Sequence, residues 1–326
     1  MSTPTKASHG VLIGALILAA WFHLGTLFLS SLFAYFVLRQ LGAVTRRKWL
    51  AFIFFLIIVA GMGYAAGYFA RTAWIALPEI ADSSIPSATA WAEKRNIELP
   101  FTDFETLKTY VVDSLKAEIH YLRNVAQFAG TVSTVLLLIL IGIVIASSLF
   151  FGSQIDAYQT AGNPRNLYST CAAEIGTRFR DFYRSFATVM GAQITISFIN
   201  TVLTAVFVLV IGLPHAALVI AVTFLCGLLP IVGNLISNAI IVFLAATLSL
   251  KFALASLVFL VAVHKLEYFL NSKIIGGRIR NPVWLTLLGL VIGEELMGIP
   301  GMILAPVVLN YLRVEMSKIE VRASVT

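Results

Sequence analysis

Long apolar runs dominate this sequence and leave little room for a water-soluble fold. Six nearly apolar blocks cover residues 11–38, 49–70, 128–151, 187–213, 216–270 and 283–312. A helix that crosses a bilayer needs about 20 apolar residues. The composition agrees, because only 12% of the residues are charged, whereas a soluble domain carries about 25%. The sequence therefore predicts an all-α polytopic integral membrane protein.

Three apolar segments have lengths that fit neither one crossing nor two. Lys251 divides the fifth block, so residues 11–38, 216–250 and 283–312 each run for about 28 to 35 residues. Each segment has a candidate break near its middle, because proline lacks an amide donor and glycine tolerates positive φ. The expected tips are His23-Leu24-Gly25, Pro230 with Gly233, and Gly298 with Pro300 and Gly301. We interpret these segments as broken, re-entrant helical hairpins.

The distribution of charge predicts the topology. Basic residues gather in the loops near residues 39–48, 165–184 and 273–280 and after residue 312, whereas residues 71–127 have mixed charge. If the three long segments are hairpins, every basic loop falls on one side, as the positive-inside rule requires. We therefore expect both termini in the cytoplasm and residues 71–127 outside. The net charge of +7 then reflects topology, and no nucleic-acid partner is expected.

This topology divides the chain into five parts. They are a membrane hairpin and crossing helix (1–70), an external helical segment (71–127), a crossing helix (128–151), a cytoplasmic amphipathic connector (152–186) and a membrane transport core with two hairpins (187–326). In the connector, Tyr168, Cys171, Ile175, Phe179, Phe182 and Phe186 recur at helical spacing. That stripe suits either a helix lying on the inner leaflet or packing against another helix.

Polar side chains inside apolar helices are costly and therefore need an explanation. Gln193, Ser197, Asn200 and Thr204 form one stripe in a predicted crossing helix, and Asn234, Ser237 and Asn238 follow the Pro230 break. The first set either lines an aqueous path or joins helices by hydrogen bonds. The second set either lines the path at a broken helix or caps the second half-helix.

Acidic residues in the last blocks are candidates for coupling to an ion. Glu294 and Glu295 are adjacent and lie beside the Gly298 break, so at least one is expected to be protonated or paired. Adjacent helical residues point about 100° apart, so one of them would face the path. The alternative is a capping and ion-pairing role. Glu267, near His264 at the expected inner end of its helix, is a third candidate. No metal site and no cofactor is expected.

Three motifs in the last 110 or so residues resemble those of a known family. They are PIVGNLI at 230–236, LEYFLNSKIIG at 266–276, and Asn281-Pro282 followed by GEELMGIPGMILAP at 293–306. These residues are similar to the autoinducer-2 exporter family of bacterial membrane proteins, also described as PerM-like permeases. The resemblance implies about eight hydrophobic helical segments and a homo-oligomer, such as a pentamer, in the bacterial inner membrane. It also implies export of autoinducer-2 or exchange of sodium or lithium for protons.

Function remains open between several classes at this stage. A secondary transporter or permease for a small solute or a monovalent cation leads, because no ATP-binding motif is present. A passive channel is the first alternative, and it would need no titratable group in its path. A membrane scaffold that uses residues 71–127 to bind partners is the second. An enzyme is not expected, because no catalytic constellation is complete.

Overall fold

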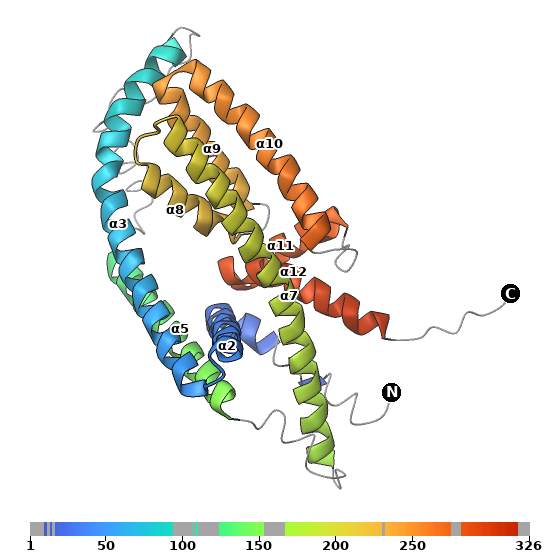
Figure 1. The fold of residues 1–326 in the computed structure, drawn as a ribbon. Coiled ribbons are helices and arrows are strands. Elements are labelled where there is room, and N and C mark those ends of the chain that lie inside the picture. The colour runs from blue at the N-terminus through green and yellow to red at the C-terminus, as the bar shows by residue number, and fades with distance from the viewer. Residues whose placement is uncertain are drawn as a thin grey trace, which may run out of the picture. The chain divides into compact units, whose positions relative to one another are not determined.

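A computed structural model of the chain describes residues 10, 11, 14, 17–93, 106, 109, 124–152, 167–229, 232–274 and 282–318. Every regular element in these ranges is helical (Figure 1). The principal helices are α2 (Gly25–Thr45), α3 (Lys48–Glu93), α5 (Asn124–Phe151), α7 (Leu167–Val210), α8 (Ala216–Gly227), α9 (Val232–Leu248), α10 (Leu250–Ile274), α11 (Val283–Met297) and α12 (Ile299–Ser317). The all-α prediction is confirmed.

The described helices include 5 segments that are long and apolar enough to cross a membrane. They are Gly25–Thr45, Lys48–Thr72, Val132–Phe151, Tyr168–Val210 and Ile299–Ser317. The described residues also include shorter apolar helices, such as α8. The described chain is therefore a polytopic α-helical membrane protein.

The chain breaks at or beside each of the three predicted tips. Residues 22–24 form a turn before α2, with His23 at a φ of 51°. α8 ends at Gly227 and α9 begins at Val232, and the two helices pack against each other. Pro230, the expected breaker, lies outside the described residues. Gly233 lies so close to the Cys226 carbonyl that a Cβ at this position would overlap it, so this hairpin requires glycine there.

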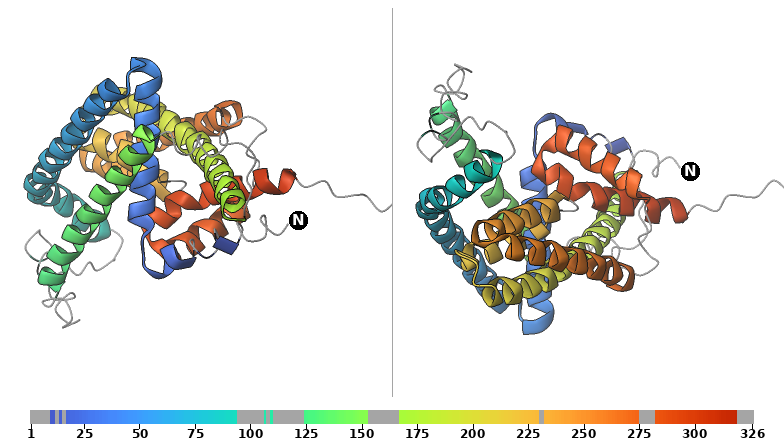
Figure 2. Two further views of the ribbon diagram at one scale, coloured as in Figure 1. Left: turned by 90° about the horizontal axis from the view of Figure 1, so that it is seen from below. Right: turned by 90° about the horizontal axis from the view of Figure 1, so that it is seen from above.

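The hairpin of α11 and α12 turns at Gly298. This residue has a φ of 64° and a ψ of −147°, a combination that is essentially restricted to glycine. Pro300 follows in the first turn of α12, where its missing amide donor costs nothing. A Cβ on Gly293 would overlap the Gly301 carbonyl, and a Cβ on Gly301 would overlap the Gly293 carbonyl. The two helices therefore lie side by side, as both views in Figure 2 show.

Two helices run further than the sequence predicts. α3 continues to Glu93, beyond the expected end of the crossing at residue 70. α7 is one helix of 44 residues and passes without a break through residue 187, where the connector was expected to give way to a crossing helix (Figure 1). Both expected boundaries came from changes in charge along the sequence. A change in charge does not by itself interrupt a hydrogen-bonded helix. Of the external helical segment expected at 71–127, residues 94–105, 107–108 and 110–123 lie outside the described residues.

The chain divides into two compact units. Unit 1 comprises Met1–Ile58, Val135–Gln193 and Ser272–Thr326, and unit 2 comprises Val59–Thr134 and Ile194–Asn271. The core of unit 1 joins Leu32 of α2, Phe186 of α7 and Val307 of α12. Aromatic contacts such as Phe33 with Phe186, whose centroids are 5.1 Å apart, fill it. Phe182 and Phe186 are thus buried against other helices, which favours the second interpretation of the connector stripe.

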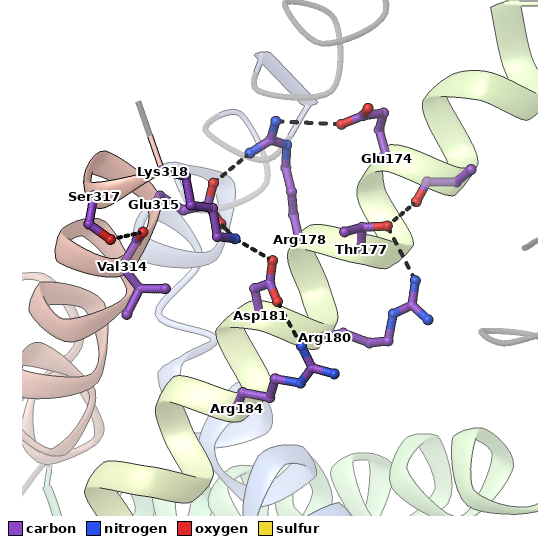
Figure 3. Close-up of polar contacts among 11 residues, drawn as sticks. Glu174, Thr177, Arg178, Arg180, Asp181, Arg184, Val314, Glu315, Ser317 and Lys318 are labelled. Atoms are coloured by element: carbon purple, nitrogen blue, oxygen red, sulfur yellow. Dashed lines mark hydrogen bonds and ion pairs between the residues drawn. The ribbon is translucent and has the colours of Figure 1, made fainter. Parts of the chain in front are cut away.

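Ion pairs join α7 to the end of α12 in unit 1 (Figure 3). Arg178 Nη1 lies 3.2 Å from Glu315 Oε2, and its Nη2 lies 3.5 Å from Glu174 Oε2. Lys318 Nζ lies 2.7 Å from Asp181 Oδ2 and 2.8 Å from Glu315 Oε1. Arg178 is buried between these acidic partners, so this side of α7 packs against α12 rather than against lipid headgroups. We call these five residues the α7–α12 ion cluster.

The core of unit 2 is apolar and lies between α7, α8, α9 and α10. Val208, Val219, Ile241 and Leu260 belong to one buried cluster. The Phe207 and Phe259 rings stack with centroids 4.1 Å apart and an interplanar angle of 2°. This packing fixes α7 and α10 beside α9, and so it positions the polar residues that these three helices carry.

Candidate functional site

A polar cluster in unit 2 brings together residues from α7, α9 and α10. The Glu267 side chain on α10 is only 15% exposed. Asn234 Nδ2, at the start of α9, donates a hydrogen bond of 2.6 Å to Glu267 Oε2. The Asn200 side chain on α7 also acts on this carboxylate as a hydrogen-bond donor. Amide donors to a carboxylate make charge-assisted hydrogen bonds, which are stronger than neutral ones.

Asn200 contributes an oxygen whose bonding is incomplete. The residue is 6% exposed, and in the described part of the chain its Oδ1 has no hydrogen-bond partner. A buried polar atom without a partner costs roughly 1–3 kcal/mol. Such an atom beside a carboxylate suits the binding of a cation or of a ligand that carries a hydrogen-bond donor.

His264 is the titratable neighbour of this cluster. Its Nδ1 lies 3.8 Å from Glu267 Oε2, one turn earlier on α10. The imidazole is largely exposed, whereas the carboxylate is not. The Glu267 carboxylate therefore faces two asparagine amides and one imidazole.

Glu294 and Glu295 lie elsewhere, in α11 of unit 1. Both side chains are exposed, and neither has an ion-pair partner among the residues that the structure describes. Glu295 lines a cavity of about 670 Å³, and Glu294 is not among its lining residues. The two carboxylates thus differ in their surroundings.

Comparison with known proteins identifies the family of the chain. The family model described as "AI-2E family transporter" matches residues 10–319, which is nearly the whole sequence. The chain belongs to this family. It is also 30% identical over 125 residues to the "Putative transport protein YdbI" of Bacillus subtilis (strain 168), a stretch that covers 38% of this chain and 36% of that relative. The family predicted from the C-terminal motifs is confirmed.

Ser197, another residue of the predicted path, has a structural partner on a neighbouring helix. Ser197 Oγ donates to the Phe224 carbonyl at 2.9 Å, and it lies so close to Gly227 that a Cβ there would overlap it. Ser197 therefore joins α7 to α8. Thr204 is also buried, while Gln193 and Asn238 are half-buried.

The residues that follow the break before α9 also separate into different roles. Ser237 is buried and donates to the Asn234 carbonyl at 3.3 Å, within its own helix. Asn234 instead turns its side chain to another helix and binds Glu267. Sequence reasoning missed Phe224, whose carbonyl accepts the hydrogen bond from Ser197, and Gly227, against which Ser197 packs. Neither residue carries a polar side chain, so the sequence held no signal for them.

Proposed function

We propose that this AI-2E family protein is a secondary transporter in which Glu267 couples the movement of a small solute to protons or monovalent cations. The supporting observation is the Glu267 carboxylate, which is largely buried and held by amides from two other helices. Ionisable side chains in membrane helices are costly and mark ion and proton pathways. The geometry therefore favours Glu267 over Glu294 and Glu295 as the coupling group.

The mechanism follows from the ligands of the carboxylate. When Glu267 is ionised, the Asn234 and Asn200 amides stabilise its charge. Uptake of a proton removes that charge, and a bound cation compensates it while also engaging the unpartnered Asn200 oxygen. Because Asn200, Asn234 and Glu267 lie on three helices, a change in the charge of one group alters how α7, α9 and α10 are held together.

Two solute classes are proposed, and both come from the family resemblance. One is export of autoinducer-2 or a similar small polar molecule. The other is exchange of a monovalent cation for protons, and it uses the Glu267 cluster directly. Flux measurements decide between them.

The test is flux in proteoliposomes with and without a pH gradient, over a panel of solutes and alkali cations. Wild-type flux should rise with the gradient, and Glu267→Gln should remove this dependence, because an amide cannot exchange a proton at neutral pH. Asn200→Leu should lower flux with normal expression, since it removes both the amide donor and the free oxygen. Glu294→Gln and Glu295→Gln are the matched acidic comparisons.

Three outcomes would contradict this assignment. Wild-type dependence on the gradient in Glu267→Gln would exclude Glu267 as the coupling group. Loss of that dependence in Glu294→Gln or Glu295→Gln would move coupling to α11. Wild-type flux that ignores the gradient would indicate a passive channel.

We also propose that the protein lies in the bacterial inner membrane as a homo-oligomer with both termini in the cytoplasm. Single cysteines at Ser83 and Ser324, in a variant without Cys171 and Cys226, should react with an impermeant reagent from opposite sides. Equal labelling of both from one side would contradict this topology. Native mass spectrometry measures the number of subunits.

A further inference from the structure

The cavity in unit 1 has the size of a small-molecule site. Its volume is about 670 Å³, and it is bounded by residues 17–23 and by α2, α7, α11 and α12. Ligand pockets typically measure about 300–1,000 Å³. Most of the lining is aliphatic, with Ile292, Leu296, Leu304 and Val308 among its residues. Such walls favour an apolar ligand.

Aromatic side chains contribute to the lining of this cavity. Trp21, Phe28 and Phe182 all line it, and the Phe28 and Phe182 rings meet with centroids 5.7 Å apart at an angle of 49°. Phe182 belongs to the buried core of unit 1 and Phe28 packs against it, so these two rings are held in place. Aromatic faces attract cations through their quadrupole.

The charge on the lining has one sign. Glu295 is the acidic residue of the lining, and no lysine or arginine is among the lining residues that the structure describes. His23, in the turn before α2, is the other titratable group. A cavity lined by one carboxylate, aromatic rings and aliphatic side chains matches a ligand that is both apolar and positively charged.

We propose that this cavity binds lipophilic organic cations, with quaternary or delocalised charge, whose charged centre lies near Glu295. Their apolar groups pack against Phe28, Phe182 and the aliphatic wall. A lipid acyl chain would fit the walls but would not respond to the carboxylate. The site belongs to unit 1 and does not depend on the coupling proposed at Glu267.

Binding of tetraphenylphosphonium to the full-length transporter in nanodiscs tests this assignment. Equilibrium dialysis against empty nanodiscs removes partition into the lipid. Tetraphenylborate has nearly the same shape and the opposite charge, and it should not bind saturably. Glu295→Gln should weaken tetraphenylphosphonium binding about tenfold, or roughly 1.4 kcal/mol. Glu294 is the neighbouring carboxylate outside the lining, so Glu294→Gln should leave the Kd within about twofold of the wild-type value.

A second variant separates the cation site from simple apolar packing. Phe28→Leu keeps an apolar side chain and removes one aromatic face, so it should weaken the cation several-fold and leave the elution profile unchanged. Saturable binding of both ions with similar affinity would assign the cavity to acyl chains and overturn the proposal. Equal weakening by Glu294→Gln and Glu295→Gln, or wild-type affinity in Glu295→Gln, would overturn it as well.

Discussion

Replacing Arg178 tests the α7–α12 ion cluster. The Arg178 and Glu315 side chains are 10% and 22% exposed and lie 3.2 Å apart, so water screens their attraction only in part. Hydrogen bonds between charged groups contribute about 1.5–3 kcal/mol. Glu315 keeps Lys318 as a second partner, which reduces the loss. We therefore expect Arg178→Met to lower the free energy of unfolding by about 1–2 kcal/mol.

Arg184 provides the matched control on the same helix. Its side chain is 77% exposed and lies 3.4 Å from Asp181, and exposed pairs contribute about 0–1 kcal/mol. Reversible unfolding in mixed micelles with increasing dodecyl sulfate, followed by circular dichroism, gives both values. The double variant Arg178→Met with Glu315→Met should show a coupling energy of about 1 kcal/mol or more. Strictly additive losses, or equal losses for Arg178→Met and Arg184→Met, would refute the reasoning.

Two further predictions concern other features of unit 1. Gly301→Ala should lower the free energy of unfolding by roughly 1–3 kcal/mol, because its Cβ would overlap the backbone of α11. Gly176 has open space around it, so Gly176→Ala should raise the free energy of unfolding by up to about 1 kcal/mol in the same assay. Equal effects of the two substitutions would contradict the close contact between α11 and α12. Hydrogen bonds to Asp181, and to a lesser extent to Glu315, raise the pKa of Lys318 in the folded protein. The contribution of charged Lys318 to the free energy of unfolding is therefore complete below the ordinary lysine pKa of about 10.4. It is lost as the pH rises through the raised pKa of the folded protein. The destabilisation by Asp181→Asn should therefore stay constant between roughly pH 7 and 9 and shrink at higher pH, and a penalty that changes within that range would contradict this assignment.

The helix breaks could be predicted because their signals are local. Glycine can adopt a positive φ, as Gly298 does. Proline is favoured in the first turn of a helix, where Pro300 lies in α12. The end of α3 could not be predicted. The helix continues from residue 70 to residue 93 although Pro78 and Pro86 lie within its bounds, and the expected boundary between the crossing and the external helical segment came from charge alone.

The candidate site could be predicted only as separate residues. Asn200, Asn234 and Glu267 were each singled out as polar groups in apolar helices, but their convergence depends on how α7, α9 and α10 pack. Ser197 belongs to the same stripe as Asn200 and yet joins α7 to α8, because a spacing of three residues places a side chain on a slightly different face. Spacing along one helix does not specify which neighbour each residue meets.

The core of unit 1 has a consequence for biogenesis. It is built from Leu32 near the start of the chain, Phe182 and Phe186 in the middle, and Leu304 and Val307 close to the end. Contacts within the α8–α9 and α11–α12 hairpins are local and can form as each pair leaves the ribosome. The aromatic face of α7 can meet α2 early, through pairs such as Phe33 with Phe186, but the contact of Phe182 with Tyr311 must wait for α12, the last helix that the structure describes. A nascent chain that stops before residue 299 would lack the α12 part of this core and leave that side of α7 exposed to quality-control proteases.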